Sequence, residues 1–401
     1  MNYEFPTITN ISDVLPAITG RDEFVVVEKD GYTVINYNVM MADTFPDVRT
    51  IIVDDIGVYS LHAALRRECR GIIFDSKTGD IIRRPFHKFF NVNEREETQD
   101  HVIDLSHPHA ILEKLDGSMI APFIVDGKMI WGTKMGATDV AKPVEEFVKN
   151  NPQYVDFANL WIKRGCTPIF EWCSRKQRIV LDYKEDQLIL TAIRNMHTGQ
   201  YMTDDVMMKF GGLLSYGITD IPVVRAFEPQ TDMKAFLEYV RDLEDLEGFV
   251  VRFDDGQMVK LKCHWYLQIH KAKEAILQDR NIVELILEEH LDDIKAHLPA
   301  EDRDRLTKFE SDFNTEVGAV VVKIAGILYD VVGKMDRKMF ALDVAPNLDP
   351  YIRPIAFKNF EGYSLEKLFD DVHNTIRNNL TKTVKYEAIR DAWFPDVVYN
   401  Q

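Results

Sequence analysis

Short stretches of alternating apolar and polar residues, separated by turn residues, fill much of the chain before residue 265. Residues 24–39 (FVVVEKDGYTVINYNV) predict two strands around the turn Asp30–Gly31. Residues 69–86 repeat the pattern with a longer turn, and residues 110–134 predict three strands with two turns. The second of those turns, Asp126–Gly127, is typical of a type I′ hairpin.

Further strands are expected at 177–183 (QRIVLDY), 187–195 (QLILTAIRN) and 247–262 (EGFVVRFDDGQMVKLK). Between them, residues 140–165 and 233–245 carry helical patterns. Hairpins interrupted by a few helices indicate an α+β domain built on antiparallel sheets.

After residue 270 the apolar residues recur every three or four positions, which predicts helices. The first segment, 281–298, has Val283, Leu287, Leu291, Ile294 and Leu298 at this spacing, with Asn281 as the expected N-cap. The second is expected to open at Pro299 and has Leu306, Phe309, Phe313, Val317, Val321, Ile324 and Leu328. The third follows Ser364 and has Leu365, Leu368, Val372 and Ile376. We therefore predict two domains, an α+β domain at 1–270 and an all-helical domain at 271–401.

Composition agrees with a soluble globular protein, since 46% of the 401 residues are hydrophobic and 28% are charged. The formal net charge of −17 argues against a general nucleic-acid coat or a membrane-surface protein. An anionic ligand would need a local basic patch. Residues 66–95 are one candidate, because they contain eight basic and four acidic residues, with Phe86, Phe89 and Phe90 among them.

Four widely spaced cysteines without a C-x-x-C pair predict buried, reduced thiols in a cytoplasmic protein rather than a zinc site or a disulfide scaffold. The first residues, MNYEFPTITN, do not resemble a signal peptide. The apolar segment 317–333 is interrupted by Lys323 and Asp330, and predicts a buried helix rather than a membrane span.

The string ILEKLDGSMI (111–120) contains the strongest candidate for chemistry, Lys114. Alone, a lysine before an Asp–Gly turn is better explained as an exposed charge beside a hairpin. Charged residues on later strands change this view: Glu171, Glu247, Lys260 and Lys262. Because residues i and i+2 of a strand share a face, Lys260 and Lys262 would present two ammonium groups to one side.

These residue types suit one reaction. An unprotonated lysine amine can attack the α-phosphorus of a nucleoside triphosphate, and nearby cations both favour the neutral amine and neutralise charge on the phosphate. Carboxylates would hold a divalent metal ion and the ribose hydroxyls, and Asp116, Glu171 and Glu247 are the candidates.

In this order and spacing, KLDG (114–117), FE (170–171), LILTAIRN (188–195), EG (247–248) and KLK (260–262) resemble motifs I, III, IIIa, IV and V of the covalent nucleotidyltransferases. These are the polynucleotide ligases and mRNA capping enzymes. The strings at 68–75, 84–94, 131–136, 178–183 and 264–266 resemble the bacteriophage RNA ligase 1 family, of the T-even phage type. Leu115 departs from the acidic residue of the T-even type. DNA ligases and capping enzymes usually continue with an OB-fold barrel, whereas this chain turns helical.

The resemblance implies a role for each matching residue. Lys114 would carry AMP. Tyr37, Arg70 and Lys88 would contact ATP, as would Lys260 and Lys262. Lys134 would contact phosphate, Glu171 and Glu247 would bind ribose and metal, and Gly117 and Gly248 would allow close backbone approach. Tyr266 would serve the ligation step. Two residues keep two interpretations each: Phe90 lines the pocket or fills the core, and Asp292 binds metal or is an exposed helix charge.

The implied activity is an ATP-dependent RNA ligase that joins 5′-phosphate and 3′-hydroxyl RNA ends with Mg²⁺, or Mn²⁺ in its place. Its expected setting is repair of cleaved tRNA anticodon loops in an infected bacterial cell, as a cytoplasmic monomer beside a polynucleotide kinase-phosphatase. The alternatives are a single-stranded DNA ligase, a GMP-using capping-type enzyme, and an RNA-end-binding adaptor without turnover. A complete set of nucleophile, carboxylates and cations argues against the adaptor.

Overall fold

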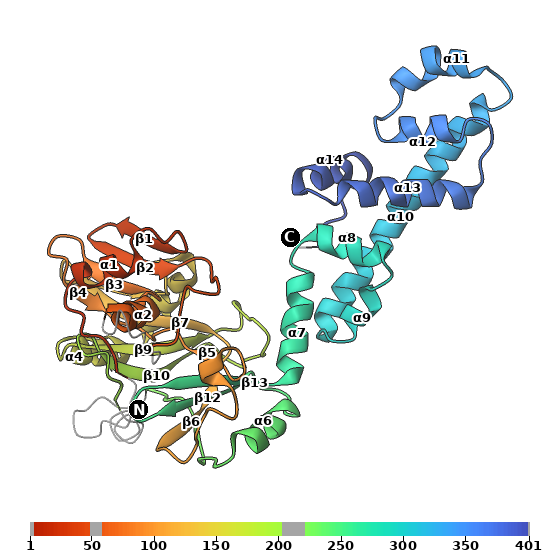
Figure 1. Cartoon of the computed structure of the whole chain (residues 1–401). Coiled ribbons are helices and arrows are strands. Elements are labelled where there is room, and N and C mark those ends of the chain that lie inside the picture. Colours follow the sequence, from red (N-terminus) through yellow and green to blue (C-terminus); the bar gives the residue numbers. More distant parts are fainter. Residues whose placement is uncertain (1–3, 49–57, 203–220, 400–401) are drawn as a thin grey trace. The chain divides into compact units, whose positions relative to one another are not determined.

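The computed structural model describes residues 4–48, 58–202 and 221–399, and the chain divides into two compact units, Met1–Leu267 and Gln268–Gln401 (Figure 1). The dividing point lies inside helix α7 (His264–Ala275), close to the boundary expected after residue 270. Antiparallel sheets in the first unit and helices in the second confirm the predicted α+β class with a helical C-terminal region.

The first sheet has the order β1-β2-β3-β4 and is antiparallel throughout. Its strands are β1 (Phe24–Lys29), β2 (Tyr32–Tyr37), β3 (Ile72–Asp75) and β4 (Ile81–Arg83). The turn between β1 and β2 is the predicted Asp30–Gly31, where Gly31 has a φ of +80° that suits glycine. Helix α1 (Ile11–Ile18) packs with this sheet and begins with a capping box formed by Asn10 and Asp13. Helix α2 (Val58–Glu68) leads into β3.

The second sheet has the order β10-β9-β7-β8. Its strands are β7 (Ser118–Val125), β8 (Lys128–Gly132), β9 (Cys166–Cys173) and β10 (Gln187–Asn195). The helix expected at 140–165 is two helices, α3 (Lys142–Asn150) and α4 (Gln153–Ile162), because Pro152 cannot continue the first helix and instead precedes the second. The apolar faces of both helices pack on this sheet.

The third sheet has the order β11-β6-β12-β13-β5, and it is antiparallel except for the pair β13–β5. Its strands are β5 (Phe90–Asn91), β6 (His109–Lys114), β11 (Ala226–Phe227), β12 (Gly248–Phe253) and β13 (Met258–Lys262). Helix α6 (Met233–Arg241) precedes β12, as expected. In the ladder, Gly248 lies opposite Lys114 on one side and Lys262 on the other. This register brings the motifs EG (247–248) and KLK (260–262) beside the turn that follows Lys114.

The strand expected at 177–183 is wrong, since residues 174–186 are irregular. The backbone N–H groups of Val180 and Leu181 both donate to the carboxylate of Asp116, at 2.7 Å each. These amides are used by one side chain, so they are not available for a strand ladder. Of the apolar run Ile179–Leu181, Val180 is buried and its two neighbours are half-buried, without forming a sheet.

The second unit is helical, with α8 (Asp279–Leu287), α9 (Leu291–Lys295), α10 (Ala300–Val331), α11 (Arg337–Met339), α12 (Ile352–Lys358), α13 (Leu365–Asn379) and α14 (Thr383–Trp393). The single helix expected at 281–298 is wrong. The chain breaks at Glu289, whose φ of +61° is incompatible with a right-handed helix, and Gln278 rather than Asn281 precedes the first helix.

Other helical predictions are confirmed. Helix α10 begins directly after Pro299, and its seven predicted apolar residues are all buried. The Ser364 hydroxyl accepts a hydrogen bond from Lys367 N and caps α13. Within the described residues, every helix is too short or too polar to cross a membrane. The four cysteines are buried thiols.

Candidate active site

Lys114 is the last residue of β6, at the entrance to a tight turn. Its Nζ lies 2.7 Å from Oε1 of Glu247, and its side chain keeps 22% of its exposure. The Glu247 side chain is nearly buried, at 4%. The same Oε1 lies 2.9 Å from Nζ of Lys262. One buried carboxylate therefore bridges Lys114 and Lys262. Glu247 can reach both lysines because the next residue, Gly248, lies between them in the ladder.

Two glycines let the backbone segments approach this closely. Gly248 has a φ of +147°, and a Cβ there would lie 1.9 Å from the carbonyl oxygen of Leu261. A Cβ on Gly117 would lie 2.4 Å from the carbonyl oxygen of Trp172. In both places the obstacle is backbone, which cannot move aside as a side chain can. At Gly117 and Gly248, where close backbone approach was predicted, any larger residue would clash with the neighbouring backbone.

A pocket of about 240 Å³ opens beside Lys114. Its polar lining includes Arg70, Lys114 and Glu171, while its apolar lining is Phe86, Phe89, Leu112, Leu115, Met119, Val224, Val250 and Met258. Gly117, Glu113, Thr191 and Arg252 complete it. An apolar slot with charged groups at one end suits a ligand that has a flat base and a phosphate chain.

Glu171 lies near the end of β9, opposite Met119 of β7. Burial raises the pKa of its carboxyl to about 7, Lys114 opposes the shift and Glu247 adds to it. A carboxyl that exchanges its proton near neutrality can either donate or accept a hydrogen bond there. Strand β9 therefore carries Glu171 to the pocket, two residues before the strand ends at Cys173.

Lys260 is the other group whose pKa is moved toward neutrality. Burial lowers the pKa to about 7, and the positive charges of Lys88, Lys114 and Arg70 contribute in the same direction. Its Nζ lies 5.6 Å from the centre of the Phe89 ring. The two lysines of β13 share a face, as predicted, since Lys262 Nζ contacts Glu247 and lies 5.0 Å from the Tyr266 ring.

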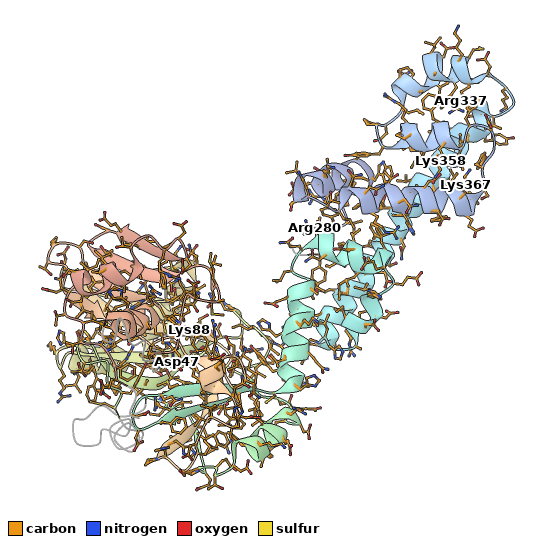
Figure 2. All side chains as sticks on the ribbon, in the orientation of Figure 1. Asp47, Lys88, Arg280, Arg337, Lys358 and Lys367 are labelled. Carbon is orange, nitrogen blue, oxygen red and sulfur yellow. The ribbon has the colours of Figure 1, made fainter. Side chains whose placement is uncertain are left out.

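Lys88 is buried among aromatic rings in the first unit (Figure 2). Its Nζ lies 5.3 Å from the ring centre of Tyr37, 5.8 Å from that of Phe45 and 5.0 Å from that of Phe90. Lys134, an exposed residue after β8, has its Nζ 5.7 Å from the Tyr37 ring. Burial alone would raise the pKa of Tyr37, but Lys88, Arg70 and Lys134 together lower it. These cations form a positive cluster that would attract a polyphosphate.

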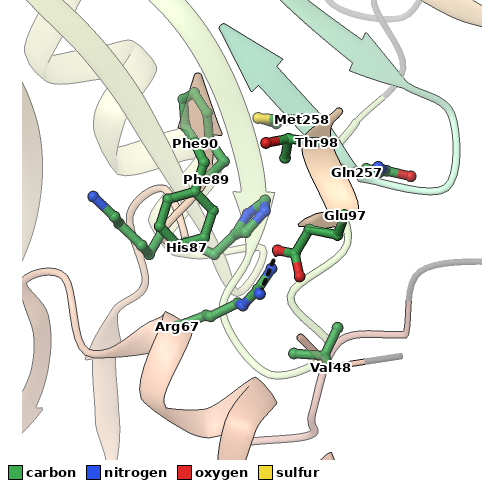
Figure 3. Close-up of a pocket in the computed structure, with 10 residues that line it drawn as sticks. Val48, Arg67, His87, Phe89, Phe90, Glu97, Thr98, Gln257 and Met258 are labelled. Carbon is green, nitrogen blue, oxygen red and sulfur yellow. Dashed lines mark hydrogen bonds and ion pairs between the residues drawn. The ribbon is translucent and has the colours of Figure 1, made fainter. Parts of the chain in front are cut away.

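Phe90 is a core residue, and a contact between Phe90 and a nucleotide stays a prediction. It is 1% exposed and packs with Phe45, and it also lines a small pocket of about 20 Å³ (Figure 3). An ion pair between Arg67 and Glu97 lines that pocket, which has room for a single water molecule. The neighbouring Phe89, rather than Phe90, lines the larger pocket beside Lys114.

Asp116 is buried and its carboxylate is occupied by protein donors. Oδ2 accepts the N–H groups of Val180 and Leu181, and Oδ1 accepts the hydroxyl of Tyr266 at 2.7 Å. The Asp116 N–H in turn donates to the hydroxyl of Tyr183 at 2.9 Å. This arrangement gives Asp116 a role in organising the turn after Lys114 and links Tyr266 to that turn.

Half of the eight basic residues in segment 66–95, the candidate basic patch, are buried in the protein rather than presented at its surface. Arg83 and Arg84 are completely buried, and Arg67 is 5% exposed. Arg84 pairs with buried Glu68, which also forms a two-pronged pair with Arg194 at 2.8 Å for each contact. Burial would raise the pKa of Glu68, but the two arginines lower it to about 2. Sequence reasoning missed this triad because its members are far apart in the chain.

Asp292 belongs to the helical unit, on α9, where its 91%-exposed side chain lies 3.5 Å from Lys295 Nζ. Within the described residues there is no group of three or more His, Cys, Asp or Glu side chains placed to hold a metal ion. A metal-binding role for Asp292 therefore remains a prediction.

The sequence profile of a family described as RNA ligase matches residues 68–266. A provisionally named RNA ligase of Thermovibrio ammonificans is 29% identical over 294 residues, which are 71% of this chain and 71% of that protein. RNA ligase 1 of bacteriophage TS2126 is 28% identical over 256 residues, 60% of each chain. A protein of Autographa californica nuclear polyhedrosis virus, provisionally named a bifunctional polynucleotide kinase/RNA ligase, is 25% identical over 58% of this chain and 35% of its own length.

Among solved structures, an archaeal ATP-dependent RNA ligase aligns with a TM-score of 0.40 and 16% identity, over 68% of this chain and 64% of that one. The Naegleria gruberi RNA ligase with ATP and Mn aligns with a TM-score of 0.38 and 15% identity, over 46% and 57% of the two chains. The profile match and the sequence relatives together show that the chain is similar to phage-type RNA ligases, over residues 68–266 in the profile match.

Proposed function

We propose that this protein is an ATP-dependent RNA ligase that joins a 5′-phosphate to a 3′-hydroxyl end through a lysyl-AMP intermediate. The observation that carries the proposal is the placement of Lys114. Its amine lies at the edge of a pocket with an apolar slot, contacts the buried Glu247, and is accompanied by Arg70, Lys260 and Lys262.

In the first step, Nζ of Lys114 forms a bond to the α-phosphorus of ATP, the bond to the bridging oxygen breaks, and pyrophosphate leaves. The attacking amine must be neutral, and Glu247 is the group in contact with it. Arg70 and Lys260 neutralise charge that grows on the phosphate oxygens. We assign Lys88 and Lys134 to the cationic cluster that receives the phosphate chain, and Tyr37 to the ring that both amines face.

Glu171 and Glu247 suit a divalent cation, because carboxylate oxygens are the ligands that such ions prefer. The two groups are close enough for the charge of Glu247 to raise the pKa of Glu171. Mg²⁺ or Mn²⁺ bound there would supply positive charge to the phosphates. Glu247 is already paired with Lys114 and Lys262, so a metal ion there would share its carboxylate with these two lysines.

In the second step, an oxygen of the RNA 5′-phosphate attacks the phosphorus of lysyl-AMP and the lysine amine leaves, giving an RNA-adenylate. In the third, the 3′-hydroxyl attacks the 5′-phosphate, AMP leaves, and a 3′–5′ phosphodiester forms. We assign Tyr266 to these later steps through its hydrogen bond to Asp116, which shapes the turn that holds Lys114.

For the substrate we propose broken tRNA anticodon loops, with the helical unit as the module that recognises them and the chain acting as a monomer. A kinase-phosphatase would prepare the ends, and the viral relative whose name joins a kinase to a ligase supports that pairing. This part rests on the resemblance to the family.

The test is incubation with α-labelled ATP and Mg²⁺, followed by denaturing electrophoresis. The wild-type chain, cleared of bound AMP, becomes labelled and Lys114→Ala does not. GTP in place of ATP tests the capping alternative, and matched RNA and DNA ends test the DNA-ligase alternative. An unlabelled wild-type chain would leave the adaptor as the better description.

A further inference from the structure

Arg83, at the end of β4, is completely buried and donates only to backbone carbonyls among the described residues. Its Nε and Nη2 donate to Gly71 O at 3.1 and 2.8 Å. Nη1 donates to Ala121 O and Gly132 O, each at 3.2 Å, and Nη2 donates to Thr133 O at 2.8 Å. One guanidinium therefore joins four carbonyls from three separate segments.

Burying a guanidinium without a carboxylate is costly. In the described part of the chain no acidic side chain pairs with Arg83, and burial lowers its pKa to about 9. The planar fork of an arginine, with five N–H donors, can satisfy several carbonyls at fixed angles, which a lysine cannot do. Because burying this guanidinium costs free energy, we ask which parts of the backbone its hydrogen bonds hold in place.

The carbonyls that Arg83 binds lie next to two residues of the proposed nucleotide site. Gly71 directly follows Arg70, and Thr133 directly precedes Lys134. These two segments also touch, since a Cβ on Gly71 would lie 2.5 Å from the carbonyl oxygen of Lys134. The buried Arg83 side chain thus holds both backbone segments, the one that carries Arg70 and the one that carries Lys134.

The Lys134 segment is itself a tight turn. Thr133 and Gly136 exchange two backbone hydrogen bonds of 2.9 Å, with Lys134 between them. On its other side, Lys29 Nζ donates to Met135 O at 2.7 Å and to Ala137 O at 3.0 Å. Lys134 is therefore presented by a turn fixed from two sides, although its own side chain is exposed.

We infer that Arg83 is a positioning residue that sets the separation of Arg70 and Lys134, and so the fit of the triphosphate, without contacting substrate. This inference rests on the proposed function. It assigns Arg83 to the step that uses ATP. Sealing of an RNA that already carries AMP needs no triphosphate, so that step should be insensitive to the spacing.

The experiment compares Arg83→Lys with wild type in two assays on the full chain: formation of lysyl-AMP from ATP, and sealing of a chemically pre-adenylylated RNA. Losing several hydrogen bonds of the fork should raise the KM for ATP about tenfold or more. Sealing of the pre-adenylylated RNA should stay within about twofold of wild type, because it bypasses the displaced cations. Wild-type chain that forms no lysyl-AMP would instead refute the proposed function.

Val34→Ala is the matched control, because Val34 is buried in the same cluster as Phe123, whose ring centre lies 5.1 Å from Arg83 Cζ, but forms none of these hydrogen bonds. It should lose stability while keeping the KM for ATP. Lys29→Met is a second variant, usable if Arg83→Lys does not fold, and it should raise the KM about threefold by loosening the same turn. An unchanged KM in the folded variants, or an equal loss in both assays, would overturn the inference.

Discussion

Oε1 of Glu247 lies 2.7 Å from Nζ of Lys114, so the nucleophile is engaged by a buried carboxylate. We expect Glu247→Gln to retain a hydrogen-bond acceptor but lose the charge that orients the amine and attracts a cation. Because a charged hydrogen bond contributes about 1.5–3 kcal/mol, lysyl-AMP formation should slow by about tenfold or more. Single-turnover labelling measures this rate. The exposed Glu244→Gln is the control, and a wild-type rate in Glu247→Gln would remove Glu247 from the mechanism.

We expect Lys260 to take up a proton when the nucleotide binds. Its pKa is lowered to about 7, below its unfolded value, so the free protein holds it mostly neutral at pH 8 and charged at pH 6. A bound triphosphate favours the charged form. Binding of a non-hydrolysable ATP analogue should therefore take up about one proton at pH 8 and close to none at pH 6.

Calorimetry in buffers of different ionisation enthalpy measures this uptake. Lys260→Arg should abolish it, since arginine is already charged, whereas the exposed Lys128→Arg should not. Full uptake in Lys260→Arg would assign the proton to Glu171 instead, whose pKa is also about 7.

Gly248→Ala tests the close approach of β12 and β13. The new Cβ would meet Leu261 O at 1.9 Å, so the ladder must separate, and we expect the free energy of unfolding to fall by more than about 2 kcal/mol. Gly127→Ala is a matched control with a φ of +76° and open space around it, and should cost about 1–2 kcal/mol. Urea unfolding measures both, and equal costs would show that the steric contact is unimportant.

Acid should weaken the first unit through Glu68. Its folded pKa of about 2 lies below the ordinary value of 4.5, so its stabilising effect is complete above pH 4.5 and is lost as the pH falls toward 2. Glu68→Gln should lower the free energy of unfolding by about 3 kcal/mol at pH 6, and the difference from wild type should shrink below pH 4. Exposed Glu28→Gln should show no such dependence, and a pH-independent difference for Glu68→Gln would contradict the assignment.

Asp116 should control the mobility of residues 177–183. In Asp116→Ala the carboxylate is removed, so Val180 and Leu181 lose the acceptor that they share. Amide hydrogen exchange in this segment should accelerate by about tenfold or more. Mass spectrometry of the peptide measures it against Asp182→Asn, whose side chain is exposed, and unchanged exchange would show that packing alone holds the segment.

The pattern of the sequence predicts local geometry well at particular residues. Asp30–Gly31 and Asp126–Gly127 mark true hairpin turns, and the spacing of Lys260 and Lys262 places both on one face of β13. It fails where a distant side chain decides the outcome. Nothing near RIVLDY reveals that Asp116 takes its amides.

Adjacent arginines illustrate the same limit. Arg83 and Arg84 read as two surface charges, yet one binds carbonyls 12 to 50 residues away and the other pairs with Glu68. Periodicity reports which face of an element is apolar, whereas a buried charge is specified by partners that only the folded chain brings together.

Gly248 lies in the ladder between Lys114 and Lys262. The length of the loop that joins β12 to β13 therefore affects the active site. Side chains alternate along a strand, so a slip of one residue exchanges its two faces. One residue added to the turn at 254–257 would leave Lys114 and Glu247 in place but rotate the whole charge pattern of β13 away from them. Among homologous or engineered chains, insertions at this turn should therefore come in pairs of residues.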